Sequence, residues 1–217
     1  MAYFPLFIDI KEKKCLVIGG GKVAKRKVDT LLMYDAHVHV VSPEICREIR
    51  EALGGEVHEG CICREAVLSP PEMEEEIRES VLVVAATGSR ETNHQVSGIC
   101  HRLGIPVNVV DAPLECTFLF PAVVKKGEIS IGINTGGSSP IVSSVIRRET
   151  EENVPDYYAD IALQLGELKS RLKKTVPEVA LRRHYLKKAA AMAFIERRTL
   201  YKEELQEILK EETGNKT

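Results

Sequence analysis

Asp111 is the residue whose type and position best suit proton transfer, because it directly follows the apolar run VNVV. An acid at the carboxyl end of a buried strand faces the crevice in which open α/β sheets bind ligands. Partly desolvated and next to a cofactor, such a carboxylate is well placed to act as a general base. The alternative role is equally open, since aspartate is also a common cap of the turn that follows a strand.

A glycine-rich turn near the N-terminus is the second group with chemical potential. An apolar run at 14–18 enters Gly19-Gly20-Gly21, and residues 22–32 follow with apolar side chains at helical spacing. The turn fits G-x-G-x-x-A, in which glycines allow a tight turn and the approach of backbone to a pyrophosphate at the helix N-terminus. This predicts dinucleotide binding, with a purely structural glycine turn as the alternative. The predicted contacts are Gly19, Gly21, Lys22, Val23 and Ala24.

Further cofactor contacts are predicted where the next strands end. The strand expected at 37–41 is followed by Ser42 and Pro43, with Glu44 next, whereas the NAD fingerprint places an acid at the strand end to bind the ribose hydroxyls. No arginine stands at that strand end to pair with the 2′-phosphate of NADP, so NAD is favoured. Thr87 follows the apolar run at 81–86 and is predicted to join the site, unless it only caps a turn or helix.

The small-residue loop NTGGSSP, residues 134–140, is predicted to enter a helix with Ser139 as N-cap and Pro140 in the first turn. Backbone N–H groups in such a loop could hold a carboxylate, although a structural cap needs no ligand. Farther on, residues 169–188 hold eight Lys or Arg and one acid, Glu178. This stretch is either a solvated helix surface or a surface that attracts a polyanionic substrate.

The candidate residues are expected at the ends of elements of an α/β fold. A short strand or edge segment is predicted at 4–10. Strands predicted at 14–18, 37–41, 56–61, 81–86 and 107–110 alternate with helices at 22–32, 43–53, from Pro71, and at 91–102. This alternation predicts a doubly wound parallel sheet of five or more strands. The expected dinucleotide-binding domain covers residues 1–113.

After residue 113 the pattern changes. Short runs at 116–119, 122–125 and 128–133 leave no room for crossover helices, so about four antiparallel strands are expected. So few strands cannot form a core alone, which suggests packing on a second subunit and makes 114–150 a dimerisation region. Helices are predicted at 141–153, 155–174, 177–195 and 202–210, and residues 151–217 are expected to form a helical domain.

Composition excludes several classes of function. With 44% hydrophobic and 29% charged residues, the 217-residue chain should be globular, and its net charge of −2 argues against nucleic-acid binding. No apolar run is long enough to span a membrane and no secretory signal is evident, so a soluble, cytoplasmic protein is expected. The six cysteines are scattered, and the C-x-C at Cys61 and Cys63 is poor zinc spacing, so no metal site is predicted.

Several strings, in this order, together resemble the precorrin-2 dehydrogenase family: PLFIDIKEKKCLVIGGGKVAKRKVDTLL, VVSP, VLVVAAT, NVVDAP, FLFPAVVKKG and INTGGSSPIVSSVIRRE. The resemblance implies NAD-dependent oxidation of precorrin-2, a tetrapyrrole, to sirohydrochlorin. It also implies a homodimer with an N-terminal Rossmann domain, a central dimerisation region and a helical C-terminal domain.

The resemblance assigns roles to individual residues. The key aspartate of the family falls on Asp111, which is also implicated in insertion of Fe²⁺ or Co²⁺ where members have chelatase activity. A serine that is phosphorylated in some members falls on Thr135. The residues expected to bind the tetrapyrrole are Asn108, Asn134, Thr135, Gly136, Gly137, Ser138 and Ser139. The alternatives to a dehydrogenase are a nicotinamide-sensing module, a chelatase without dehydrogenase turnover, and a methyltransferase.

Overall fold

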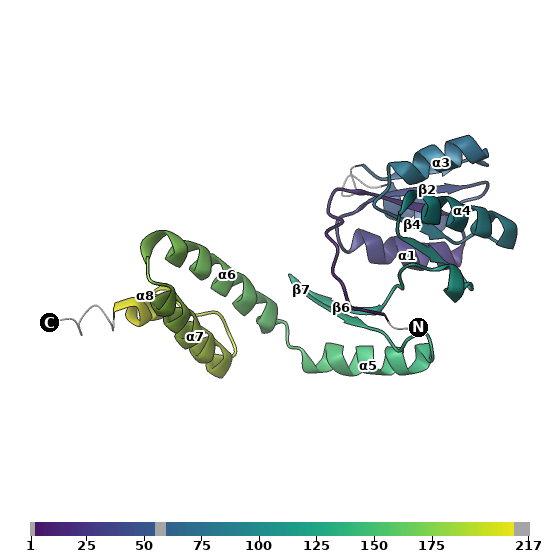
Figure 1. The fold of residues 1–217 in the computed structure, drawn as a ribbon. Helices are drawn as coiled ribbons and strands as arrows, with labels where there is room; N and C mark the ends of the chain where they lie inside the picture. The colour runs from purple at the N-terminus through teal and green to yellow at the C-terminus, as the bar shows by residue number, and fades with distance from the viewer. Residues whose placement is uncertain (1–2, 55–59, 211–217) are drawn as a thin grey trace. The chain divides into compact units, whose positions relative to one another are not determined.

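The structure is a computed structural model that describes residues 3–54 and 60–210. The chain divides into two compact units, Met1–Phe120 and Pro121–Thr217. In Figure 1 the first unit contains the parallel sheet with its covering helices, and the second contains a hairpin and the later helices. The domain boundaries predicted at residues 113 and 150 stay predictions.

Within the described residues, the first unit is built on a five-stranded parallel sheet with the order β3-β2-β1-β4-β5. In this sheet Ile18 pairs with Val41 on one side and with Ala85 on the other. The strand order reverses between β1 and β4, which is the place where doubly wound sheets bind ligands. The strands are β1 (Lys14–Ile18), β2 (His37–Ser42), β3 (Ile62–Glu65), β4 (Leu82–Ala85) and β5 (Val107–Val109).

Helices cover both faces of this sheet, as the positions of α1, α3 and α4 in Figure 1 illustrate. Cys15 and Val17 of β1 pack into one core cluster with α1 and α2, and Leu16 and Ile18 pack into the other with α3 and α4. Strand alternation thus sorts the apolar side chains of one short run between two faces. The helices are α1 (Lys22–Leu32), α2 (Arg47–Leu53), α3 (Pro70–Arg78) and α4 (Arg90–Leu103).

The second unit begins with an antiparallel hairpin, β6 (Ala122–Lys126) and β7 (Ile129–Ile133), which turns at Gly127 with a φ of +54°. Four helices follow: α5 (Pro140–Asn153), α6 (Tyr157–Thr175), α7 (Val179–Glu196) and α8 (Lys202–Lys210). The last three share one core cluster, in which Leu168 and Leu172 of α6 pack with Ala189 of α7 and Ile208 of α8. The predicted fold class is therefore confirmed.

Two predicted strands are wrong. Residues 4–10 form neither strand nor helix, and most of their apolar side chains are exposed, for example those of Phe4 and Phe7. Residues 116–119 are an extended connection after a 3₁₀ turn, η2 (Pro113–Glu115), and Thr117 bonds to Val107 without forming a ladder. An apolar run becomes a strand only where a neighbouring strand offers a continuous row of partners.

Some boundaries also differ from the prediction. The helix predicted at 43–53 begins only at Arg47, because residues 43–46 form the turn between β2 and α2. Most of the strand predicted at 56–61 lies outside the described residues, and the observed strand, β3, begins at Ile62. Of about four antiparallel strands expected, residues 121–210 contain two.

Candidate functional site

The three glycines of the N-terminal turn have different structural roles. Gly19 has a φ of +127°, and a Cβ there would collide with the carbonyl oxygen of Ala86. At Gly20 a Cβ would collide with the carbonyl oxygen of Glu44. Gly21 has a φ of −89°, and a Cβ there would meet no protein atom within 4 Å. The fold itself requires the first two glycines, whereas the open space at Gly21 suits close approach by a ligand.

The N-terminus of α1 has the features of an anion site. Gly21 is its N-cap, no side chain caps the first turn, and that turn contains no acid. The exposed Lys22 and half-buried Val23 begin the helix, and Ala24 is fully buried against the sheet. Backbone N–H groups and the helix dipole at this end both favour a bound phosphate, so the turn fits the pyrophosphate of a dinucleotide.

Backbone hydrogen bonds hold the carboxyl ends of four strands together. The nitrogen of Gly19 donates to the Val41 carbonyl at 2.9 Å, and the nitrogen of Ala86 donates to the Ile18 carbonyl at 2.8 Å. The nitrogen of Val110 donates to the Ala85 carbonyl at 2.9 Å. The residues that end or follow these strands therefore share one sheet edge, and they include Gly19, Gly21, Ser42, Pro43, Glu44, Thr87 and Asp111.

Thr87 is held by its neighbours at this edge. Its hydroxyl donates to the Asn93 side-chain oxygen at 2.7 Å and accepts from the backbone nitrogen of Ser89 at 3.2 Å. Ser89 is the N-cap of α4, so the turn-and-capping role that the sequence left open for Thr87 is present in the structure. Asn93 is buried and was missed, because no sequence pattern reveals which polar residue of a helix faces a strand end.

Asp111 lies in the left-handed region, with a φ of +58°, and is exposed. The expectation of a partly desolvated carboxylate is wrong for this chain by itself. Ala112, not Asp111, is the N-cap of η2, and no side chain caps that turn. Across residues 3–54 and 60–210, no hydrogen bond or ion pair engages the Asp111 carboxylate, which leaves it available to a ligand.

Asn108, which was predicted to bind substrate, makes a structural contact within the first unit. Its side chain is buried, and its Nδ2 donates to the carbonyl oxygen of Phe118 at 3.1 Å. Val107 and Val109, its neighbours in β5, pack into the cluster with α3 and α4, so alternation turns Asn108 to the opposite face. Asn108 therefore secures the segment after η2 to β5, and a direct contact with substrate is not supported.

The loop at 134–139 belongs to the second unit and is described there by itself. Ser139 is the N-cap of α5 with Pro140 behind it, as predicted, and its hydroxyl accepts from the Val142 nitrogen at 3.3 Å. The Thr135 hydroxyl lies 2.9 Å from that of Ser143. Ser143 was missed, although its position one turn into α5 is a signal that it could face the loop.

Part of this loop is bonded to itself. The nitrogen of Gly136 donates to the Asn134 side-chain oxygen at 2.9 Å, and the nitrogen of Ser138 donates to the Thr135 carbonyl at 3.1 Å. These two N–H groups are therefore not free to hold a carboxylate, contrary to the expectation of an open cradle. Gly136 and Gly137 both have positive φ values, +65° and +80°, which the turn requires.

The basic stretch at 169–188 is divided between structural and exposed side chains. Arg182 donates to the carbonyl oxygens of Val176 and Pro177, at 2.9 and 3.2 Å, and so closes the connection between α6 and α7. Arg183 and Lys187 are exposed and lie one turn apart on α7. These two remain available to attract an anionic ligand.

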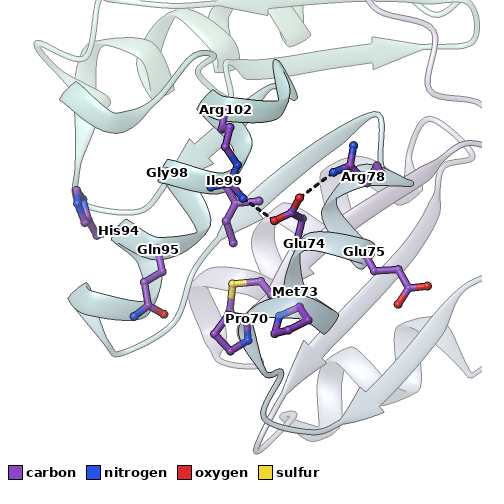
Figure 2. Close-up of a pocket in the computed structure, with 11 residues that line it drawn as sticks. Pro70, Met73, Glu74, Glu75, Arg78, His94, Gln95, Gly98, Ile99 and Arg102 are labelled. Atoms are coloured by element: carbon purple, nitrogen blue, oxygen red, sulfur yellow. Dashed lines mark hydrogen bonds and ion pairs between the residues drawn. The ribbon is translucent and has the colours of Figure 1, made fainter.

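A groove between α3 and α4 lies apart from these residues. Figure 2 shows Glu74 between two arginines, with Arg78 at 2.7 Å and Arg102 at 2.5 Å. None of the predicted site residues lines it, so it is not part of the candidate site.

Within residues 3–54 and 60–210, no helix is long and apolar enough to cross a membrane. Among the same residues, no group of three or more His, Cys, Asp or Glu is placed to hold a metal.

Siroheme synthases are among the proteins that this chain resembles in sequence. The chain is 36% identical to a siroheme synthase of Nitrosospira multiformis over 196 residues, which is 90% of this chain and 41% of that protein. A siroheme synthase of Nitrosomonas eutropha is also 36% identical over 90% of this chain and 40% of its own length. The chain thus spans about two fifths of the length of these curated relatives.

One solved structure, "SirC, precorrin-2 dehydrogenase", shares the fold with a TM-score of 0.77 and 21% identity, over 95% of this chain and 97% of its own. A family model described as "Putative NAD(P)-binding" matches residues 6–122. That match covers more than half of the chain and includes the glycine turn, Thr87 and Asp111. The chain therefore belongs to this family of NAD(P)-binding domains.

Proposed function

We propose that this chain is an NAD-dependent dehydrogenase that oxidises precorrin-2 to sirohydrochlorin, as a cytoplasmic homodimer. The observation that carries the proposal is Asp111, an exposed, unengaged carboxylate in the left-handed region at the sheet edge that also carries the glycine turn. Backbone strain of this kind concentrates at functional sites. The names of the siroheme synthase relatives and of SirC suggest the tetrapyrrole as the substrate class.

The chain's own residues fit a bound dinucleotide. Gly21 leaves room for the pyrophosphate, and the uncapped first turn of α1 supplies N–H donors to it. Ser42 ends β2 and Glu44 follows it, where the adenosine ribose is bound in this type of fold. Glu44 is an acid that can accept from ribose hydroxyls and would repel the 2′-phosphate of NADP, which favours NAD.

The chemistry divides between the cofactor and Asp111. When bound, NAD supplies the hydride acceptor. Oxidation of the tetrapyrrole also releases a proton, which the Asp111 carboxylate accepts as general base and later passes to solvent. Because no side chain of the described residues competes for this carboxylate, both of its oxygens are free for the task.

The second unit offers contacts for the anionic substrate. Precorrin-2 carries many carboxylates, and the hydroxyls of the 134–139 loop together with Arg183 and Lys187 of α7 can bind or attract them. The nitrogens of Gly136 and Ser138 donate within the loop, and the Thr135 hydroxyl donates to the Ser139 carbonyl at 3.1 Å, so the exposed Ser138 hydroxyl is the loop's more accessible hydroxyl donor.

Dimerisation is supported by α5, which buries none of its residues within the chain. Ile141, Val142, Val145 and Ile146 are between 38% and 76% exposed and are spaced to form one apolar stripe. A second copy of the chain would cover this stripe, since a soluble protein rarely leaves such a surface open.

The test is to give the purified protein precorrin-2 with NAD, with NADP or with neither, and to follow sirohydrochlorin by its absorption. Product should form fastest with NAD and not at all without a dinucleotide. Parallel reactions that add Fe²⁺ or Co²⁺ to sirohydrochlorin measure chelation separately. Failure to form sirohydrochlorin with either dinucleotide, from a protein that binds NAD, would contradict the dehydrogenase assignment.

A further inference from the structure

The turn that carries Asp111 is held by the thiol of Cys116, just beyond η2. The sulfur lies 3.2 Å from both the nitrogen and the carbonyl oxygen of Val109, and 3.5 Å from the carbonyl oxygen of Ala112. The Val109 N–H donates to sulfur, and the S–H can donate to one of the two carbonyls. These contacts bracket Asp111 from both sides along the chain.

Two neighbours of Cys116 reinforce its position. Thr117 bonds to Val107 through two contacts: its hydroxyl accepts from the Val107 nitrogen at 2.7 Å, and its nitrogen donates to the Val107 carbonyl at 2.9 Å. Asn108 donates to Phe118 at 3.1 Å. The segment after η2 is thus tied along β5, and the thiol of Cys116 is delivered to the 109–112 turn.

The chemical state of the thiol suits this role. Burial raises the pKa of Cys116 above its ordinary value, so the sulfur keeps its proton at neutral pH and has an S–H to donate. Cys116 is half-buried, and its thiol is one that the proposed dehydrogenation does not use.

We propose that Cys116 is a positioning residue for Asp111: the Cys116 thiol bridges the two ends of the 109–112 turn and so keeps Asp111 in its left-handed conformation. A non-glycine residue holds that conformation only when its surroundings determine it. The backbone bond from the Ala112 nitrogen to the Val109 carbonyl, at 3.4 Å, spans Asp111, and the Cys116 thiol contacts the residues at both ends of that same turn. The inference rests on the proposed function, because the geometry of this turn affects turnover only when Asp111 is the base.

The kinetic test compares Cys116→Ala and Cys116→Ser with the control Cys63→Ala, which removes an exposed thiol from β3 of the same sheet. Cys116→Ala should lower kcat by about tenfold or more while the Kd for NAD stays within about twofold, because a misplaced base slows only the chemical step. Cys116→Ser keeps a donor and acceptor and should recover most of the rate. Wild-type kcat in Cys116→Ala, or no recovery in Cys116→Ser, would contradict the proposal. If Cys116→Ala fails to fold, Cys116→Val replaces it.

A double mutant separates positioning from general damage. If the thiol acts through Asp111, Cys116→Ala should add little to the defect of Asp111→Asn. An additional tenfold loss in the double mutant would show that Cys116 acts elsewhere and would overturn the proposal.

Amide hydrogen exchange gives a readout that needs no substrate. The Val109 amide should exchange faster in Cys116→Ala than in the wild type or Cys63→Ala, because it loses its acceptor. An unchanged exchange rate of the Val109 amide would contradict the positioning role of Cys116, whether or not the enzyme turns over. A wild-type protein without turnover but with the expected exchange pattern would instead overturn only the proposed function.

Discussion

The side chain of Asn93 is bonded to Thr87 at three points. Its oxygen accepts from the Thr87 hydroxyl at 2.7 Å and from the Thr87 nitrogen at 3.1 Å, and its Nδ2 donates to the Thr87 carbonyl at 3.2 Å. Asn93 lies in the first part of α4 and is only 7% exposed. One buried amide therefore fixes the end of β4 at the sheet edge where the dinucleotide is proposed to bind.

Replacing Asn93 with alanine should cost about 1–3 kcal/mol of the free energy of unfolding, because Thr87 loses its three hydrogen bonds to Asn93 at a half-buried position. It should also weaken NAD binding, since the turn after β4 loosens. Chemical denaturation and titration with NAD measure the two effects. Gln95→Ala, on an exposed position of the same helix, is the control and should change neither. An Asn93→Ala protein with wild-type stability would refute the anchoring role.

The glycine turn provides a matched pair of substitutions. Gly19→Ala should destabilise the protein by at least about 2 kcal/mol, because it combines a positive φ with a collision against the Ala86 carbonyl. Gly21→Ala meets no protein atom, so its stability should remain near that of the wild type while the Kd for NAD rises about tenfold or more. Thermal melts and NAD titrations test the pair. Undiminished NAD affinity in Gly21→Ala would remove the turn from the cofactor site.

An ion pair in the second unit predicts a dependence of stability on pH. Glu204 accepts from Arg198 at 2.9 and 3.0 Å and from the Tyr201 nitrogen at 2.6 Å, and the bond to Arg198 is the main reason that its pKa falls to about 2. The folded pKa lies below the ordinary value of 4.5, so the stabilisation is present above that value and is lost as pH falls toward about 2.

Wild-type protein should therefore melt at a higher temperature than Glu204→Gln at neutral pH, and the gap should close as pH is lowered through this window. Glu203→Gln makes the same charge change at an exposed neighbour in α8 and should leave the melting temperature nearly unchanged. A gap between wild type and Glu204→Gln that is the same at neutral pH and near pH 2 would show that the pair contributes nothing through its charge.

The exposed basic residues of α7 should steer the substrate. Arg183→Glu with Lys187→Glu should raise the KM for precorrin-2 several-fold at low salt, and leave the Kd for NAD unchanged, because long-range attraction acts on the polyanion. Added salt should shrink the difference from wild type. Lys202→Glu reverses a charge at the exposed start of α8 and is the control, which should leave the KM for precorrin-2 nearly unchanged. An unaltered KM at low salt would leave these residues as ordinary surface.

The elements of the first unit were predictable where a local pattern decides them. Residues 14–32 give strand, turn and helix because a continuous apolar run ends at the glycines and apolar side chains then recur at helical spacing. Residues 4–10 are just as apolar as a strand, yet they find no strand to pair with, and pairing is not encoded in the segment itself. The same reason explains the absence of a strand at 116–119, where β5 accepts isolated bonds from Thr117 but no ladder.

The candidate site was predictable in its position but not in its supporting contacts. Asp111 and Thr87 could be placed on one edge because parallel strands all end there. The left-handed φ of Asp111, and its bracketing by Cys116, depend on how the chain folds back after η2, which no spacing rule describes. The contact that Asn108 makes could not be predicted for a related reason: a polar residue in a strand can as well bind a backbone carbonyl as a ligand.

The most direct test of the central claim is the single-turnover rate of precorrin-2 oxidation by Asp111→Asn. Asparagine tolerates the left-handed conformation of Asp111 and is nearly isosteric with it, so only the ability to take a proton is removed. The rate should fall by about a hundredfold or more, while the Kd for NAD stays within about twofold of the wild-type value. A rate equal to that of the wild type, or a loss of NAD affinity that accounts for the whole decrease, would contradict the assignment of Asp111 as the base.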